Sequence, residues 1–401
     1  MRIKLLGGVG LAIIFSAVAS AEVPDLETVR SEINQFDLDQ TAEVDQTEAY
    51  GALSVIEQNG STNEAIIVQK DSANDGGDAV LTSLIYQTGS DNYASVDQNT
   101  DASDDFSNGS LIIQDGADSS VIVSQDGGAS DPNLVGVYQG AGSDNATTVY
   151  QSGDANITGI AQVGDRGFAS VVQTGESNNV VAVQTGQSDN FTADQTGDFN
   201  LIGILQSGTG ANNYATVTQT GDFNSVIADQ ATDEGVLSIE QIGTNNEVGG
   251  AESAFKQTVN PGNAHIMQVG DYNSLTGIQS GFRTEFTLVQ TGDQNSATLD
   301  QSGRKGEISL TQTGSLNMAE LNQRGRRNTS LLEQNGSANS LFLDQAGTDN
   351  LVDIHQSADE AYASVKQESG YDNAVFISQE SFGAYATVIQ NGHANIATIR
   401  Q

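Results

Sequence analysis

Glutamine recurs at a fixed interval along most of the chain. In two continuous runs a glutamine occupies every eleventh position. The runs are Gln257, Gln268, Gln279, Gln290, Gln301, Gln312, Gln323, Gln334, Gln345, Gln356 and Gln367, and Gln151, Gln162, Gln173, Gln184, Gln195 and Gln206. A strict short period over this length indicates a repeat architecture, made by stacking one small unit. Such a protein usually acts through its surface or its assembly rather than through a single pocket.

The residues inside each period alternate in character. From Asn295 to Gln301 the alternate positions hold Asn, Ala, Leu and Gln, and the positions between them hold Ser, Thr and Asp. An alternation of period two is typical of a strand, because successive side chains leave opposite faces. The segment Gln290 to Asn295 reads Gln-Thr-Gly-Asp-Gln-Asn, which is turn chemistry. Since one strand and one turn make half a coil, the sequence predicts an all-β, two-sheet parallel β-solenoid with coils of about 22 residues.

The inward asparagines and glutamines are expected to form amyloid-like columns. Stacked coils bring equivalent residues to about 4.8 Å from each other, so each amide meets its copies above and below. A buried amide is costly when it is unpaired, so these columns would fix the register of the coils. The predicted column residues are Gln290, Asn295, Gln301, Gln312, Asn317, Gln323, Gln334, Asn339, Gln345, Gln390, Asn395 and Gln401.

The repeat resembles that of a known family. The pattern Gln-x-Gly-x-x-Asn-x-Ala-x-x-x-Gln is complete at Gln290–Gln301 and Gln390–Gln401, and occurs at Gln219–Gln230 with Val226 in place of Ala. It resembles the curlin repeat of bacterial curli, the secreted subunits of amyloid fibres, over about residues 140–401. The resemblance implies export through an outer-membrane secretion pore, contacts with other curlin subunits and head-to-tail growth into matrix fibres. It leaves open whether this chain is a major subunit, a minor nucleating subunit or a specialised relative.

The N-terminus has the features of a secretory signal. Arg2 and Lys4 precede an apolar stretch from Leu5 to Val18, and Ala19-Ser-Ala21 follows it. This order predicts a cleaved signal peptide over residues 1–21. The stretch is too short and too rich in glycine for a membrane anchor, and no later segment could span a bilayer. We therefore expect a secreted protein that reaches the cell surface through the periplasm.

Composition sets further limits. The chain has no cysteine, so no disulfide can stabilise it after export. Its net charge of −38 argues against nucleic acid as a partner and keeps the unassembled chain soluble. Aromatic residues make up only 6% and tryptophan is absent, which favours a thin core shared along a solenoid over one large core.

The regularity of the repeat changes along the chain. Strand-like alternation begins at Asn34–Gln40 and Ala42–Gln46, and polar insertions at 71–78 and 101–109 are expected to form loops at corners. Gln401 stands on the repeat with no polar cap behind it, which predicts an open strand edge. The predicted segments are a signal peptide (1–21), an acidic leader (22–50), irregular curlin-like repeats with loop insertions (51–139) and the regular curlin-repeat solenoid (140–401).

No combination of residues predicts catalysis. His265, His355 and His393 are far apart in the sequence and none has metal-ligand spacing. No Gly-x-Ser-x-Gly elbow is present. Five aspartates share one turn position and could bind cations weakly, although charged turns that slow association are the favoured interpretation: Asp154, Asp198, Asp222, Asp271 and Asp293. We expect no enzyme activity, no cofactor and no metal site.

One basic cluster interrupts the acidic background. Arg283, Lys305 and Arg327 are spaced 22 residues apart, as are Arg304 and Arg326. On coils of this length they would stack along a single corner. The cluster is interpreted either as a docking site for an acidic partner, such as another subunit or a surface polymer, or as a solvated ridge.

These observations favour a structural function. The sequence predicts an exported subunit that adds strands to a template and forms curli-like fibres for cell adhesion and biofilm matrix. The alternative is a soluble monomeric β-solenoid that acts as a carbohydrate-binding adhesin or a carbohydrate-active enzyme. That alternative needs a carboxylate or aromatic cluster that breaks the period on one face, and the sequence shows none.

Overall fold

The computed structural model describes two compact units. The units are Met1–Ser207 and Gly208–Gln401. The described residues are 30–47, 52–71, 81–100, 108–127, 131–208, 212–250 and 253–401. The predicted signal peptide lies outside them, as do residues 72–80 and 101–107, which contain most of the two predicted insertions.

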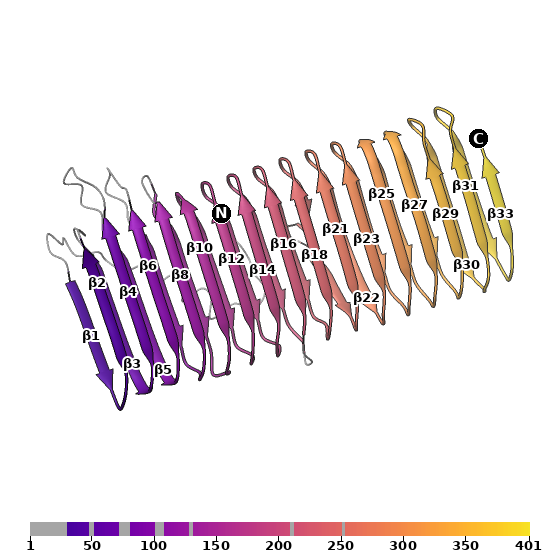
Figure 1. Cartoon of the computed structure of the whole chain (residues 1–401). Coiled ribbons are helices and arrows are strands. Elements are labelled where there is room, and N and C mark those ends of the chain that lie inside the picture. The colour runs from indigo at the N-terminus through magenta and orange to yellow at the C-terminus, as the bar shows by residue number, and fades with distance from the viewer. Residues whose placement is uncertain are drawn as a thin grey trace. The chain divides into compact units, whose positions relative to one another are not determined.

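The first unit consists of two parallel sheets, A1 and B1, whose strands alternate along the chain (Figure 1). Sheet A1 contains β1 (Arg30–Phe36), β3 (Leu53–Ser61), β5 (Thr82–Ser90), β7 (Gly109–Gln114), β9 (Leu134–Gln139), β11 (Ile157–Gln162), β13 (Asn179–Gln184) and β15 (Leu201–Gln206). Sheet B1 contains β2 (Thr41–Thr47), β4 (Glu64–Asp71), β6 (Tyr93–Thr100), β8 (Ser120–Gly127), β10 (Ala146–Gly153), β12 (Phe168–Thr174) and β14 (Asn190–Thr196).

The second unit repeats this arrangement with sheets A2 and B2. Sheet A2 contains β17 (Ser225–Gln230), β19 (Glu247–Val248), β20 (Phe255–Val259), β22 (Ser274–Gly281), β24 (Ser296–Gln301), β26 (Met318–Gln323), β28 (Ser340–Gln345), β30 (Tyr362–Ser369) and β32 (Tyr385–Asn391). Sheet B2 contains β16 (Tyr214–Thr220), β18 (Val236–Ile242), β21 (Asn263–Val269), β23 (Glu285–Thr291), β25 (Glu307–Ser315), β27 (Thr329–Ser337), β29 (Leu351–Gln356), β31 (Ala374–Gln379) and β33 (Ile396–Arg400).

Strand register follows the glutamine period. Gln290 pairs with Gln312 between β23 and β25, and Gln301 pairs with Gln323 between β24 and β26. The same 22-residue step joins β10 to β12, where Gln151 pairs with Gln173. The predicted all-β, two-sheet parallel β-solenoid is therefore confirmed in each unit.

A thin core lies between the two sheets of each unit. Along each strand the side chains alternate between buried and more exposed, as in the β24 sequence Ser-Ala-Thr-Leu-Asp-Gln, whose Ala, Leu and Gln are buried. The inward positions hold a small apolar residue, a large apolar residue and the glutamine, for example Ala297, Leu299 and Gln301. Each coil therefore buries few apolar groups, and stability comes from repeating the same layer.

The turns differ in one respect from the expected glycine turns. Glycines such as Gly292 have a positive φ of 105°, but the left-handed conformation belongs to the residue just before the asparagine, whatever its type. Gln294 and Leu316 have φ of 58° and 59°. Their backbone N–H groups donate to the carbonyls of Asp271 and Asp293 in the preceding coil, which offsets the unfavourable backbone conformation.

The first strand departs from its predicted position. A strand ending at Gln40 is wrong, because β1 ends at Phe36 and Gln35 pairs with Gln58. Gln40 instead occupies the corner position that asparagine takes in other coils, and its Nε2 donates to the carbonyl of Gly60 at 2.7 Å. Alternation alone did not distinguish the two registers. The eleven-residue step from Gln35 to Gln46 does distinguish them.

Candidate functional site

The glutamine side chains form hydrogen-bonded columns inside each unit. Nε2 of Gln290 donates to Oε1 of Gln312 at 2.8 Å and to the carbonyl of Ser274 at 3.2 Å. Oε1 of Gln290 accepts from Gln268 at 2.8 Å. Gln290 is fully buried, so both amide N–H groups and the oxygen find partners without water. Each glutamine thereby joins its coil to both neighbouring coils, and joins sheet B2 to sheet A2.

The other predicted glutamines up to Gln345 have the same geometry, whereas Gln390 and Gln401 accept from the preceding glutamine and donate to a backbone carbonyl. The donor–acceptor distances between successive members range from 2.8 to 3.2 Å in the two columns of the second unit. In every case Nε2 donates to the glutamine with the higher residue number. The predicted members are Gln290, Gln301, Gln312, Gln323, Gln334, Gln345, Gln390 and Gln401.

Asparagines form a second set of columns at the corners. Nδ2 of Asn317 donates to Oδ1 of Asn295 at 3.0 Å and to the carbonyl of Gly336 at 2.9 Å. The backbone N–H of Asn317 also donates to Oδ1 of Asn295, at 3.1 Å. The predicted Asn395 bonds to Asn373 in the same way, at 3.0 Å. These bonds fix the path of the chain as it enters each strand.

One predicted asparagine is incompletely bonded. The backbone N–H of Asn339 donates to Asn317 at 3.1 Å, and its own Oδ1 accepts from the N–H of Ala361 at 2.8 Å. Its buried Nδ2 has no partner in the described part of the chain. The asparagine column ends there because Ala361 replaces the asparagine of the next coil.

Sequence reasoning missed two further sets of ladder contacts. Inward hydroxyls at the small position donate to the glutamines, as Ser330 does to Oε1 of Gln345 at 3.0 Å. Turn carboxylates accept hydrogen bonds from the backbone of the preceding coil. The backbone N–H of Asp271 donates to Oδ1 of Asp293 at 3.1 Å, and the backbone N–H of Thr244 donates to Oδ1 of Asp271 at 2.8 Å. The signal was present in the sequence as a recurrent aspartate after Gln-x-Gly. These acids therefore stabilise the stack as well as carrying charge.

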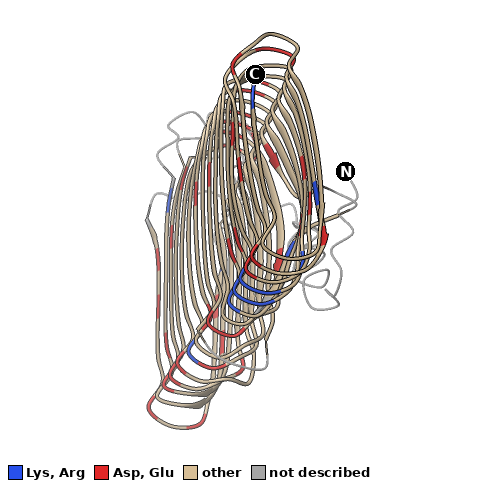
Figure 2. Cartoon of the chain, turned by 90° about the vertical axis from the view of Figure 1, so that its right-hand side faces the viewer, with Lys and Arg blue, Asp and Glu red and all other residues tan. Residues whose placement is uncertain are grey.

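The structure stacks the predicted basic residues at one corner of the second unit. Arg304 pairs with Arg326 in adjacent coils, and Arg283, Lys305 and Arg327 occupy equivalent turn positions with φ of 54–56°. Figure 2 shows Lys and Arg on neighbouring turns at a corner, among turns that carry Asp and Glu. The sequence spacing thus brings these five residues together.

Part of this charge is engaged within the chain. The guanidinium groups of Arg283 and Arg304 lie 5.2 and 5.0 Å from the ring centre of Phe282. Arg327 forms a bidentate ion pair with Asp349 of the next coil. This hydrogen bond lowers the pKa of Asp349 and raises the pKa of Arg327.

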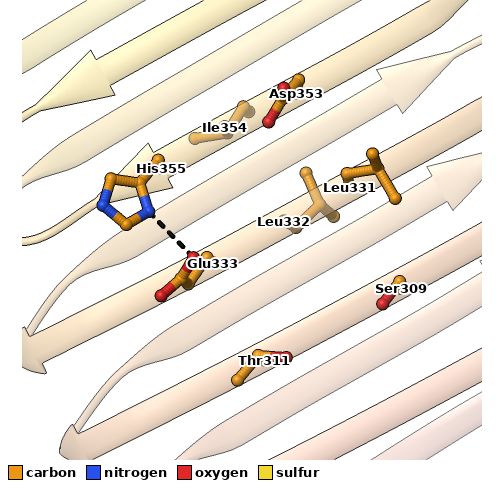
Figure 3. Close-up of a pocket in the computed structure, with 8 residues that line it drawn as sticks. All are labelled: Ser309, Thr311, Leu331, Leu332, Glu333, Asp353, Ile354 and His355. Carbon is orange, nitrogen blue, oxygen red and sulfur yellow. Dashed lines mark hydrogen bonds and ion pairs between the residues drawn. The ribbon is translucent and has the colours of Figure 1, made fainter.

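A shallow pocket lies on the outer side of sheet B2 (Figure 3). It has a volume of about 220 Å³ and spans β25, β27 and β29. His355 and Glu333 pair across 2.9 Å, and both side chains are about half exposed. Among the described residues no group of three or more His, Cys, Asp or Glu side chains could hold a metal ion. In that part of the chain there is also no helix long and apolar enough to cross a membrane.

These features define a class of protein. Parallel two-strand coils joined by buried amide columns make the chain a β-solenoid repeat protein. The model of the curlin associated repeat matches residues 142–175, 189–221, 210–249, 285–314, 317–347 and 347–380. The chain is therefore a curlin-repeat protein, and this family and fold are structural rather than enzymatic. No curated protein matches the sequence.

Proposed function

We propose that the protein is an exported structural subunit that assembles into curli-like amyloid fibres for cell adhesion and biofilm matrix. The observation that carries this proposal is the identity of successive coil contacts. Gln290 meets Gln312 as Gln312 meets Gln334, at the same distance of 2.8 Å and with the same register. The upper side of one coil is therefore complementary to the lower side of any other coil, including a coil of a second copy.

The last described coil illustrates how such an addition would proceed. Gln390 and Gln401 donate to the carbonyls of Ala374 and Tyr385, each at 3.1 Å. Within the described residues neither has a following glutamine to receive its other N–H. Among the described strands, β33 pairs only with β31, whereas β31 pairs with a strand on each side. Ile396 on β33 is accordingly 75% exposed. An incoming coil would gain backbone bonds, amide bonds and apolar contact at once.

Export and partners follow from the family in this proposal. The curlin repeat supports an extracellular location, an outer-membrane pore as the export route and other curlin subunits as fibre partners. The exposed acids of the turns would keep the unassembled chain apart from its copies until it reaches the cell surface. The predicted signal peptide at 1–21 would direct the first step.

The test is fibre formation by the purified exported protein. We expect fibres that show a cross-β reflection at about 4.7–4.8 Å, bind amyloid dyes and seed fresh protein. A chain that stays monomeric for days at micromolar concentration would exclude this function and favour the soluble adhesin. Mass spectrometry of the exported N-terminus tests the signal peptide independently.

The basic corner is proposed as a docking site for an acidic partner. Its support is the spacing of Arg283, Lys305 and Arg327 along adjacent coils of an otherwise acidic chain. Acidic turns of another subunit would provide complementary charge at the same coil repeat.

A further inference from the structure

The first and the last described coils have the same length and opposite charge. The first coil is residues 30–46 and the last coil is residues 385–401, and in each of them eleven residues separate the two glutamines. The first coil carries five acids and one base, whereas the last carries one arginine, one histidine and no acid. This acid-free coil contrasts with the net charge of −38 of the whole chain.

Each of these two coils has one uncovered side. Among the strands that the structure describes, β1 pairs only with β3, and β33 only with β31. Ile33, an inward residue of β1, is 44% exposed, and Ile399, an inward residue of β33, is only partly buried. Leu299, at an inward position between other coils, is 2% exposed. The core therefore ends at both coils in a surface that a further coil can cover.

We propose that the coil 385–401 of one copy binds the coil 30–46 of a second copy, and that charge selects this pairing and its register. The proposal rests on the assembly function proposed above and specifies the two surfaces that meet. The second copy is called the partner. In the proposed register Gln390 meets the partner's Gln35, and Gln401 meets the partner's Gln46.

This register continues the glutamine columns from one copy to the next. Nε2 of Gln35 donates to Oε1 of Gln58 at 2.7 Å, as each glutamine inside the second unit donates to the following one. Oε1 of Gln35 is therefore the atom that a preceding glutamine would bond. Gln390 and Gln401 each have an amide hydrogen for which the described residues provide no acceptor. The two surfaces are thus complementary in hydrogen bonding.

The core and the turn of the two coils match as well. In the proposed register the partner's Ile33 lies over Val388, so that a large apolar residue covers another. The turns between the two strands of each coil have equal length. Asp39 and Ala394 occupy the same place in these turns, with left-handed φ of 59° and 54°. No insertion or change of backbone path is needed for the two coils to stack.

Arg400 carries the charge that selects the partner surface. It is exposed on the outer side of β33, where its neighbour on β31 is Ser378. On its other side the proposed register places the partner's Asp45, with the partner's Glu43 two residues away on the same face. Both acids are exposed on β2. Opposite charges directly across a strand pair stabilise the pair, and like charges destabilise it.

Tyr385 provides a second matched contact. Its ring stacks on the ring of Tyr362, with the centres 4.6 Å apart and the planes at 4°. The other face of the Tyr385 ring is directed at the next coil position, and the residue is 64% exposed. The proposed register places the partner's Arg30 there. Arg30 already lies on the outer side of β1, paired with Glu32 at 3.0 Å, and a guanidinium within about 6 Å of a tyrosine face is attracted to it.

These charges are expected to act on rate and choice more than on affinity. An exposed ion pair contributes only about 0–1 kcal/mol. Charge complementarity speeds the encounter and disfavours wrong partner surfaces. Because each copy is strongly acidic, most pairs of surfaces repel each other. The acid-free coil 385–401 is the exception, and the coil 30–46 is its acidic complement.

Cysteine trapping tests the register, because the chain has no cysteine of its own. Exported protein with Ile389→Cys is mixed with exported protein that carries Asn34→Cys, and disulfide-linked peptides are measured by mass spectrometry after mild oxidation. The two sites would lie about 4.8 Å apart, within reach of a disulfide. The matched control is Glu32→Cys, on the same face of β1 but about 8 Å from Ile389. We expect at least about ten-fold more mixed disulfide with Asn34→Cys.

A charge exchange tests the selection. Arg400→Asp should slow fibre elongation at low salt about ten-fold, and Asp45→Arg should also slow it. Both substitutions in one chain restore the original net charge and should return the rate to within about two-fold. The matched control is Arg166→Asp at an exposed turn of the first unit, which changes the net charge as Arg400→Asp does and should slow elongation less.

Three results would overturn the proposal. The first is equal trapping with Asn34→Cys and Glu32→Cys, and the second is a double exchange that elongates no faster than the single variants. The third is a dominant disulfide between two Ile389→Cys chains, which would place two final coils against each other. Dye binding on the same samples reports fibres separately. Fibres without the selective disulfide contradict only this pairing of coils, and the selective disulfide without fibres contradicts only the assembly function.

Discussion

Nε2 of Gln312 lies 2.8 Å from Oε1 of Gln334, one coil further along the chain. The same nitrogen lies 3.2 Å from the carbonyl oxygen of Ser296 in the opposite sheet, and Oε1 of Gln312 accepts from Gln290. One buried side chain thus contacts three other residues in both sheets of the unit. The period of the sequence exists because two of these three bonds need a glutamine at the same place in the neighbouring coil.

Replacement of Gln312 by alanine should therefore destabilise the second unit. The substitution removes three hydrogen bonds of about 1 kcal/mol each, and it leaves one N–H of Gln290 and Oε1 of Gln334 buried without their partner. We therefore expect the free energy of unfolding to fall by about 3 kcal/mol. The control is Gln294→Ala in an exposed turn, where Ala338 occupies the equivalent position in another coil. It should change the free energy of unfolding by less than about 0.5 kcal/mol. Urea midpoints that do not differ between the two variants would contradict the role of the column.

Two glycines should respond differently to alanine. Gly292 has φ of 105°, and a Cβ there would lie 2.2 Å from the carbonyl oxygen of Gly314 in the next coil. Gly383 has φ of 63° and nothing within 4 Å of an added Cβ. We expect Gly292→Ala to cost about 3 kcal/mol or more, because the coils must separate. Gly383→Ala should cost about 1 kcal/mol, from backbone strain alone. Thermal or urea unfolding of both variants checks this order, and equal losses would show that coil spacing is not limiting.

Leu316 is the site of a stabilising substitution. It is 56% exposed and has φ of 59°, a conformation that asparagine tolerates better than leucine. Leu316→Asn should raise the free energy of unfolding by about 0.5–1 kcal/mol. Leu331→Asn, at a 43% exposed position inside β27, should lower it because asparagine disfavours strands. The same sign for both variants would contradict this explanation of the turn.

The ion pair of Arg327 and Asp349 predicts a dependence on pH. The pKa of Asp349 is lowered in the folded chain, mainly by the hydrogen bond from Arg327. The pair therefore contributes stability above the unfolded pKa of aspartate, about 3.9, and this contribution is lost as the pH falls through the lower folded value. Arg327→Gln should raise the pKa of Asp349 measured by NMR. Arg326→Gln should raise it less, because Arg326 acts only through its more distant charge. A larger effect of Arg326→Gln would reverse the assignment.

The proposed docking corner can be tested by charge reversal. Replacing Arg283, Lys305 and Arg327 together by glutamate should lengthen the lag before fibres form and reduce their bundling, because the corner would then repel acidic turns. Glutamate at the same number of basic residues elsewhere (Arg166, Lys256 and Lys366) changes the net charge equally and should have a smaller effect. Unchanged lag time and bundling in the first variant would identify the corner as a solvated ridge.

The sequence predicted the coil because two independent periods agree. Alternation identified Ala297 and Leu299 as inward, and the eleven-residue step set the register that pairs Gln301 with Gln323. Both periods depend on backbone geometry, which local residue type reports well. Gln40 lies between Gln35 and Gln46, so alternation alone fits a strand that ends at Gln40 as well as one that contains Gln35. The structure has the second register, with Gln35 paired to Gln58.

Contacts that depend on the neighbouring coil were harder to predict. The left-handed residue before each asparagine could not be read from its type, since Leu316 and Gln294 share that conformation with aspartates and arginines. The bond from Asp271 to the carboxylate of Asp293 needs the turns to be stacked before the carboxylate can reach.

The glutamine columns of the second unit have a chemical sense, because from Gln257 to Gln379 each Nε2 donates to the glutamine with the next higher number in its column. A coil placed upside down on another would bring amide hydrogens against amide hydrogens, or oxygens against oxygens. A stack that extends the glutamine columns in this sense keeps one orientation, and each glutamine column offers amide hydrogens at one end and amide oxygens at the other. The asparagine columns run in the opposite sense, since Nδ2 of Asn317 donates to Oδ1 of Asn295.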